Sequence, residues 1–83
     1  YEGEWRNNLP HGRGVMKFPD GGRYDGEYKR GFPNGTGTLY YPDGEKYAGQ
    51  FINGQRYGNG TLYSKTGAIE KKGVWMHDKF MGE

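Results

Sequence analysis

The chain has 83 residues and a net charge of +2, so it forms at most one small domain, and its charge is too mild for a nucleic-acid-binding surface. It contains 17 glycines and 8 tyrosines, so aromatic rings must supply most of the packing in a thin core. The absence of cysteine excludes disulfides and thiolate metal sites, and no apolar run approaches the roughly 20 residues that span a bilayer, so we expect a soluble chain.

Two short segments of alternating residues open the chain, at residues 1–6 and 13–18. Each is bounded by residues typical of turns: Asn7 and Asn8 after the first, Pro19, Asp20 and Gly21 after the second. No stretch combines helical apolar spacing with helix caps, so helices are not expected. The pattern predicts antiparallel strands joined as hairpins.

A three-residue loop at residues 20–22 would close the first such hairpin, with a glycine in the left-handed position. This register places Phe18 opposite Tyr24, Met16 opposite Gly26 and Gly14 opposite Tyr28. On the other face it places Lys17 opposite Asp25 and Val15 opposite Glu27, so one face is aromatic and the other mostly polar.

The whole arrangement recurs with a period of 23 residues, beginning at Tyr1, Tyr24 and Tyr47. We divide the chain into units 1–23, 24–46 and 47–70 and a partial unit 71–83. The fourth unit starts one residue late, at Lys71, and we expect a longer turn over residues 66–70 to absorb the extra residue. That turn would place Leu62 opposite Gly73 and Gly60 opposite Trp75.

The recurring glycines explain the expected shape of the sheet. A glycine beneath a neighbouring ring lets the ring lie on bare backbone and favours twist. The sequence therefore predicts an all-β fold: a single-layer, twisted, antiparallel sheet of successive β-hairpins.

Residues for catalysis are few. Ser64 is the single serine, and His11 and His77 belong to connections in different units, so no nucleophile with an adjacent base is evident. The acids of the polar face, Glu2, Glu4, Asp25 and Glu27, are expected to form cross-strand ion pairs with Arg13 and Lys17. The Gly-x-Gly segments precede no helix, and no His and carboxylate cluster has ligand spacing, so we expect no enzyme, no metal and no cofactor.

The aromatic face is the first candidate binding surface, because a single layer has nothing of its own to cover it. Large exposed apolar patches mark interaction sites, although packing of the rings on the glycines alone is an alternative. The predicted partner-binding groove comprises Trp5, Tyr24, Tyr28, Leu39, Tyr47, Phe51, Leu62 and Trp75.

A basic corner is the second candidate surface. It comprises Lys65, Lys71, Lys72 and Lys79, beside Tyr63 and Trp75. Such a corner could contact an anionic phospholipid surface, pack against a neighbouring domain, or be a solvated edge whose lysines discourage strand pairing.

The motif Tyr-x-Gly-x-Trp, followed by Gly-x-Gly and Pro-Asp-Gly, resembles the MORN (membrane occupation and recognition nexus) repeat. Lys71 replaces the leading Tyr of the last unit, and Lys65-Thr66-Gly67 replaces Pro-Asp-Gly. The resemblance implies a solenoid of hairpins that acts as a scaffold in cytoskeletal assemblies or at membranes, or that accompanies a catalytic domain.

Our interpretation is a non-catalytic scaffold whose curved aromatic face binds a peptide or helix of a partner protein, or a neighbouring domain of its own chain. The alternatives are recruitment to anionic phospholipid membranes and an accessory role beside an enzyme. We expect a cytoplasmic location, associated with the cytoskeleton or a membrane surface, and no nucleic-acid partner. Unpaired strand edges at both ends would also allow an edge-mediated homo-oligomer.

Overall fold

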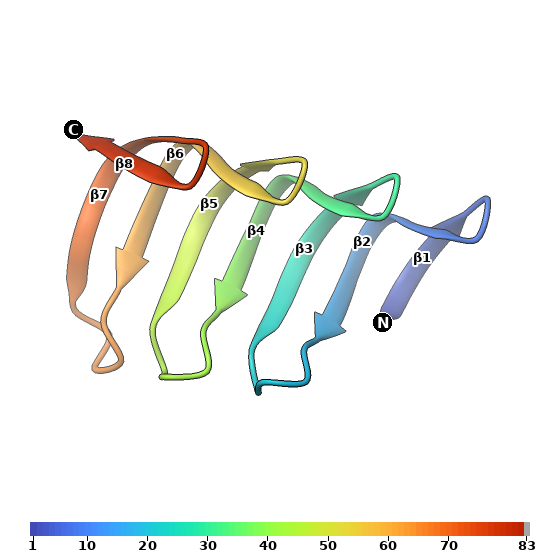
Figure 1. Cartoon of the computed structure of the whole chain (residues 1–83), viewed down its shortest axis with the longest axis horizontal. Helices are drawn as coiled ribbons and strands as arrows, with labels where there is room; N and C mark the ends of the chain where they lie inside the picture. Colours follow the sequence, from blue (N-terminus) through green and yellow to red (C-terminus); the bar gives the residue numbers. More distant parts are fainter. Residues whose placement is uncertain (83) are drawn as a thin grey trace.

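Eight antiparallel strands form one open sheet, in which they lie side by side in chain order (Figure 1). The computed structural model describes residues 1–82 and measures 37 × 24 × 15 Å. The all-β, single-sheet fold predicted from the sequence is confirmed, and this part of the chain contains no helix that could cross a membrane. The strands are β1 (Glu2–Arg6), β2 (Leu9–Lys17), β3 (Arg23–Lys29), β4 (Phe32–Tyr40), β5 (Lys46–Ile52), β6 (Gln55–Tyr63), β7 (Ile69–Met76) and β8 (Lys79–Gly82).

Two-residue turns join the strands within each unit. In all four turns both residues have positive φ angles, between 49° and 88°. Such turns match the natural twist of a hairpin, and Asn and Gly adopt them at little cost. The second strand of the first unit therefore begins at Leu9, four residues earlier than residues 13–18 predict. The turns are Asn7-Asn8, Arg30-Gly31, Asn53-Gly54 and His77-Asp78.

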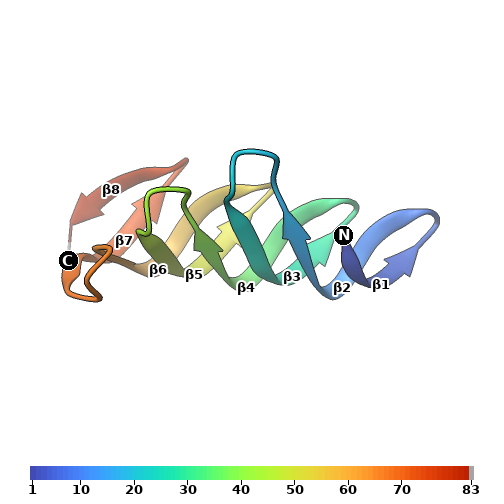
Figure 2. The ribbon, with the colours of Figure 1, turned by 90° about the horizontal axis from the view of Figure 1, so that it is seen from below.

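A wide bulge inside each of the first three hairpins bends the sheet. Gly3 faces Gly14 and Trp5 faces Pro10, so residues 11–13 of β2 face Glu4 alone. Gly12, in the middle of this bulge, has a φ angle of 81°, which glycine adopts without strain. The same shift recurs between β3 and β4 and between β5 and β6. Bulges increase twist, and the sheet is accordingly coiled (Figure 2).

The register between units differs from the predicted one by two residues. Between β2 and β3, Gly14 faces Gly26, Met16 faces Tyr24 and Gly12 faces Tyr28. The pairs predicted between these two strands are therefore wrong. Because the shift is even, each side chain stays on the face that the sequence predicts.

The register differs because the connecting loop contains five residues, 18–22, where three were predicted. Phe18 N donates a hydrogen bond to Gly22 O (2.9 Å) and Gly21 N donates to Phe18 O (3.1 Å). Gly22 N also donates to Asp20 Oδ1 (2.9 Å), so the aspartate stabilises the turn from within. The loop at residues 41–45 repeats these backbone bonds, and Leu39 consequently faces Tyr47, as Met16 faces Tyr24 one unit earlier.

The extra residue of the third unit lies in a strand and not in a turn. The loop at residues 64–68 has the same length as the earlier loops. Tyr63 faces Ile69 and Leu62 faces Lys71, so Glu70 is left out of the pairing as a bulge in β7. The prediction of a longer turn is wrong, and Gly60 faces Gly73 as the equivalent glycines face each other elsewhere.

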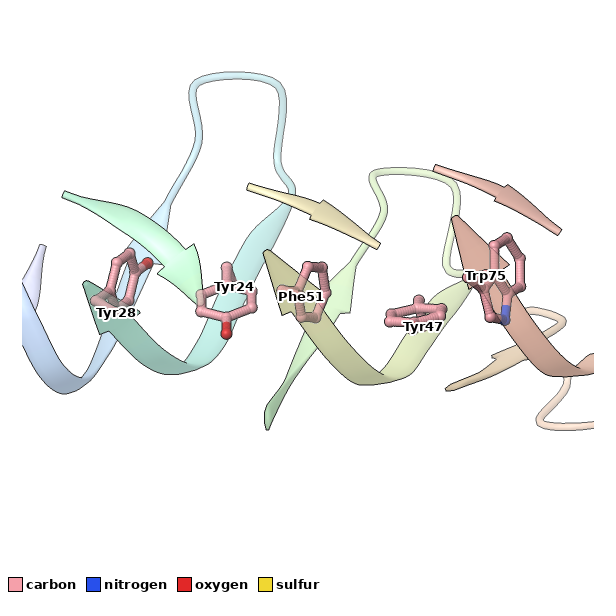
Figure 3. Packing of buried hydrophobic residues seen from close by; sticks show 5 residues of the cluster. All are labelled: Tyr24, Tyr28, Tyr47, Phe51 and Trp75. Atoms are coloured by element: carbon pink, nitrogen blue, oxygen red, sulfur yellow. The ribbon is translucent and has the colours of Figure 1, made fainter. Parts of the chain in front are cut away.

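Five aromatic side chains form the buried core and lie in one row along the sheet (Figure 3). They belong to β3, β5 and β7, and none is more than 3% exposed. The sheet buries them by coiling around them, since residues 1–82 form a single layer. The core residues are Tyr24, Tyr28, Tyr47, Phe51 and Trp75.

Candidate partner-binding groove

The first tyrosine of each full unit lies across a pair of facing glycines. Tyr24 occupies the space where a Cβ of Gly37 would be, and its hydroxyl lies 2.8 Å from the position of a Cβ on Gly26. The hydroxyl then donates a hydrogen bond to Glu27 O (2.9 Å), at the bulge. Tyr1 and Tyr47 make the same contacts in their units. Packing of rings on glycines is therefore confirmed, although each glycine faces another glycine in the ladder.

The rings of successive units contact one another edge to face. The ring of Tyr24 lies 5.1 Å from that of Tyr28 and 5.0 Å from that of Phe51, both close to perpendicular. Such T-shaped pairs contribute about 0.5–1.5 kcal/mol beyond the area that they bury. The contacts continue along the molecule in the order Trp5, Tyr1, Tyr28, Tyr24, Phe51, Tyr47, Trp75 and Phe80, which we call the aromatic column.

Five of the eight residues predicted to form the groove are the buried core and offer almost no surface to a partner. Trp5, at the end of the aromatic column, is the exception among the rings, with 57% of its surface exposed. Leu39 and Leu62 are half-buried and pack against the core. The expectation of an accessible aromatic face fails for these five rings because a coiled single layer covers its own inner face.

An open groove remains above this core, between the loops and the two-residue turns. Tyr24 and Phe51 lie at its base, and its volume is about 400 Å³. Its sides are mainly apolar and come from Phe18, Pro33, Leu39, Tyr41 and Pro42. The predicted groove residues did not include Phe18, Pro33, Tyr41 or Pro42. The recurrence of proline in equivalent loops, at Pro19 and Pro42, was a signal that could have found Pro42.

Burial changes the acidity of the tyrosines around the groove. It raises the pKa of Tyr24 and Tyr41 above the usual value of 10.0. It also raises the pKa of Tyr28 to about 12. The Tyr28 hydroxyl is buried without a hydrogen-bond partner, whereas the Tyr24 hydroxyl has one. These phenols are therefore neutral groups at physiological pH.

The glutamates of the first strands stabilise the bulges. Glu4 Oε1 accepts a hydrogen bond from Arg13 N (2.8 Å), and Glu27 Oε1 accepts one from Thr36 N (2.7 Å). Gln50 makes the equivalent bond to Asn59 N (2.8 Å) in the third unit. None of the expected ion pairs with Arg13 and Lys17 forms among residues 1–82. The carboxylates of Glu4 and Glu27 instead accept hydrogen bonds from bulge N–H groups that have no strand partner.

The pattern of landmarks in sequence and structure is that of a known repeat family. The family model described as MORN repeat matches residues 1–23, 24–46 and 47–69. The chain belongs to the MORN repeat family. MORN repeats are in general modules for interaction with proteins or membranes. No curated protein matches the chain.

The fourth hairpin lies outside the matched MORN repeats but continues their packing. Trp75 extends the aromatic column, and its Nε1 donates a hydrogen bond to Gly60 O (3.0 Å). Lys71 stands where the other MORN units have tyrosine, and its Nζ lies 5.9 Å from the centre of the Phe80 ring. Phe80 therefore takes the next place in the column.

The structure does not gather the four lysines of the predicted basic corner into one patch. Lys71 is directed toward Phe80, whereas Lys72 lines a depression with Ala48 and Asn59 on the opposite face. Lys65 lies in the loop after β6, against Gly44, and Lys79 begins β8. All four side chains are exposed.

The polar side chains considered for catalysis lie apart in this MORN array. Ser64 stabilises its own loop, where its Oγ lies 2.8 Å from Thr66 Oγ1 and accepts a hydrogen bond from Ala68 N (3.2 Å). His77 lies in the last turn, with Nδ1 3.1 Å from Gln55 Oε1. His11 lies in β2, in the first unit. Across residues 1–82 no three His, Asp or Glu side chains lie close enough together to hold a metal ion.

Proposed function

We propose that this MORN array is a non-catalytic interaction module whose groove holds a peptide or helix of a partner protein, or of a neighbouring domain of its own chain. The observation that carries the proposal is the apolar groove above the core. Its volume is about 400 Å³, and its sides are mainly apolar.

The division between base and sides supports this function. Tyr24 and Phe51 are fixed in the aromatic column beneath the groove, where they support its sides but offer almost no surface to a partner. Phe18, Leu39 and Tyr41 are only half-buried, so part of each ring or side chain is free for a partner. Aromatic side chains that are held in place lose little entropy on binding and often dominate binding energy.

Site-specific photo-crosslinking tests the proposal, because it captures a partner whose identity is still to be determined. A benzophenone amino acid replaces Pro42 at the rim of the groove, and in a control chain it replaces the exposed Phe32 of β4. The peptide crosslinked from position 42 is identified by mass spectrometry, synthesised, and titrated against the purified chain.

The double variant Phe18→Ser/Tyr41→Ser should weaken binding of that peptide by about tenfold or more, equivalent to about 1.4 kcal/mol. Phe32→Ser is the matched control, because it removes an exposed ring from outside the groove. Circular dichroism establishes that each variant is folded. Equal affinity of the double variant and the wild type, or crosslinking from position 32 alone, would refute the groove.

A further inference from the structure

A second, chemically different cleft lies between the first two turns of the sheet. Its volume is about 250 Å³. It is lined by Arg6, Asn7, Leu9, His11, Lys29 and Arg30. Three of these side chains carry a permanent positive charge, so the cleft is strongly basic in a chain whose net charge is +2.

Among residues 1–82, no carboxylate forms an ion pair with the basic side chains of this cleft. None of the lining residues is acidic. Glu4 and Glu27, the nearest acids along β1 and β3, are held by the backbone N–H groups of Arg13 and Thr36. Within residues 1–82 the one ion pair joins Arg56 and Asp78, in other hairpins. Three neighbouring cations repel one another unless an anion lies between them.

This concentration of charge is confined to the first two units. The residues equivalent to Arg6 and Lys29 in the third and fourth units are Ile52 and Met76. The residue equivalent to Arg30 is Asn in the first and third units. Arg30 has a φ angle of 53°, a left-handed conformation that suits Asn better than Arg, so its guanidinium is present despite a backbone cost.

The backbone holds the two sides of the cleft in a fixed arrangement. Gly31 N donates a hydrogen bond to Pro10 O (2.9 Å), which ties the second turn to the first hairpin. The side chain of Leu9 packs against the same turn, 3.5 Å from the position of a Cβ on Gly31. The backbone positions that carry the basic side chains are therefore held close together before any ligand arrives.

We propose that this cleft binds a phosphate group through Arg6, Lys29 and Arg30. Each guanidinium donates paired hydrogen bonds that match two phosphate oxygens, and the lysine adds a compact charge. The phosphate is carried either by a soluble phosphate ester or by the headgroup of an acidic lipid, since both present the same oxygens to the cleft.

Titration of the 83-residue chain with inorganic phosphate, followed by amide NMR shifts, tests the site itself. The test variant is Arg6→Gln/Lys29→Gln/Arg30→Asn, in which Asn suits the left-handed turn. The control Lys65→Gln/Lys72→Gln/Lys79→Gln removes the same charge from exposed positions elsewhere. We expect saturable shifts at residues 6, 29 and 30 with a dissociation constant of about 1 mM or tighter, weakened at least about tenfold in the test variant alone.

Vesicle binding distinguishes the two sources of phosphate. Sedimentation with phosphatidylcholine vesicles, with and without phosphatidic acid, is measured for the wild type and both variants. Binding to acidic vesicles that the test variant alone loses assigns the cleft to a lipid headgroup, and phosphate binding without vesicle binding assigns it to a soluble ester. Shifts that do not saturate with phosphate, or equal losses in both variants, overturn the proposal.

Discussion

The side chain of Tyr24 crosses the backbone of Gly37, and its hydroxyl reaches Glu27 O at a distance of 2.9 Å. This contact is possible because Gly37 faces Gly26 across the ladder, so neither residue places a side chain in the path of the ring. In each full unit the first tyrosine thus contacts two facing glycines and donates a hydrogen bond to the backbone at the bulge.

A methyl group at Gly37 should therefore destabilise the chain. Its Cβ would meet the Tyr24 ring, so we expect Gly37→Ala to lower the free energy of unfolding by about 1–3 kcal/mol through overpacking. Urea denaturation measures the loss. The loss should be smaller in a Tyr24→Leu background, where the ring is absent. Additive losses would contradict the contact.

Two tyrosines of the same strand should respond in opposite ways to loss of the hydroxyl. Tyr24→Phe removes a hydrogen bond and should cost about 1 kcal/mol of unfolding free energy. Tyr28→Phe removes a buried hydroxyl that has no partner, so the variant should be as stable as the wild type or more stable by up to about 1 kcal/mol. Thermal denaturation of both variants in parallel decides the matter, and a larger loss in Tyr28→Phe would contradict the assignment.

The hydrogen bond from Thr36 N to the Glu27 side chain should persist when the carboxylate is replaced by an amide, but not when the side chain is truncated. Glu27→Gln keeps an oxygen for Thr36 N, as Gln50 does for Asn59 N, and should change stability little. Glu27→Ala leaves the N–H to water and should cost about 0.5–1.5 kcal/mol. Urea midpoints compare the two variants. Equal losses would show that the charge, and not the hydrogen bond, matters.

Alkaline pH should unfold the chain through its buried phenols. Burial raises the pKa of Tyr24, Tyr28 and Tyr47 in the folded state, whereas the unfolded chain releases these protons near pH 10. Above that pH the unfolded state binds fewer protons, so the stability present below about pH 10 falls as the pH rises toward the folded-state values. Urea midpoints at about pH 8 and about pH 11 test this. Equal midpoints would contradict it.

The sequence predicts the period, the hairpins and the face of each side chain, because alternation and turn residues are local signals. It does not specify the register, since Pro19, Asp20 and Gly21 suit a loop of three or of five residues. The register is fixed by a contact between residues far apart in the chain. The Tyr24 ring packs on Gly37, and this packing requires Gly37 to face Gly26.

The sequence also does not show which groove residues are accessible. Whether Tyr28 or Phe51 is exposed depends on how strongly the sheet coils, and the coil depends on bulges at Gly12 and its equivalents. Spacing alone does not separate a ring that serves as the base of a groove from one that lines its side. The basic cleft likewise forms only because the turn at Arg30-Gly31 is hydrogen-bonded to Pro10 of the preceding hairpin, a contact between residues far apart in the chain.

The aromatic column pairs the first ring of one unit with the fifth-position ring of the next, as Tyr24 does with Phe51. The structural module is thus out of phase with the sequence repeat. A chain cut at a repeat boundary would leave a tyrosine without its covering neighbour. Artificial arrays of this type should therefore be lengthened by whole units and completed by a substitute ring, in the way that Phe80 packs on Trp75.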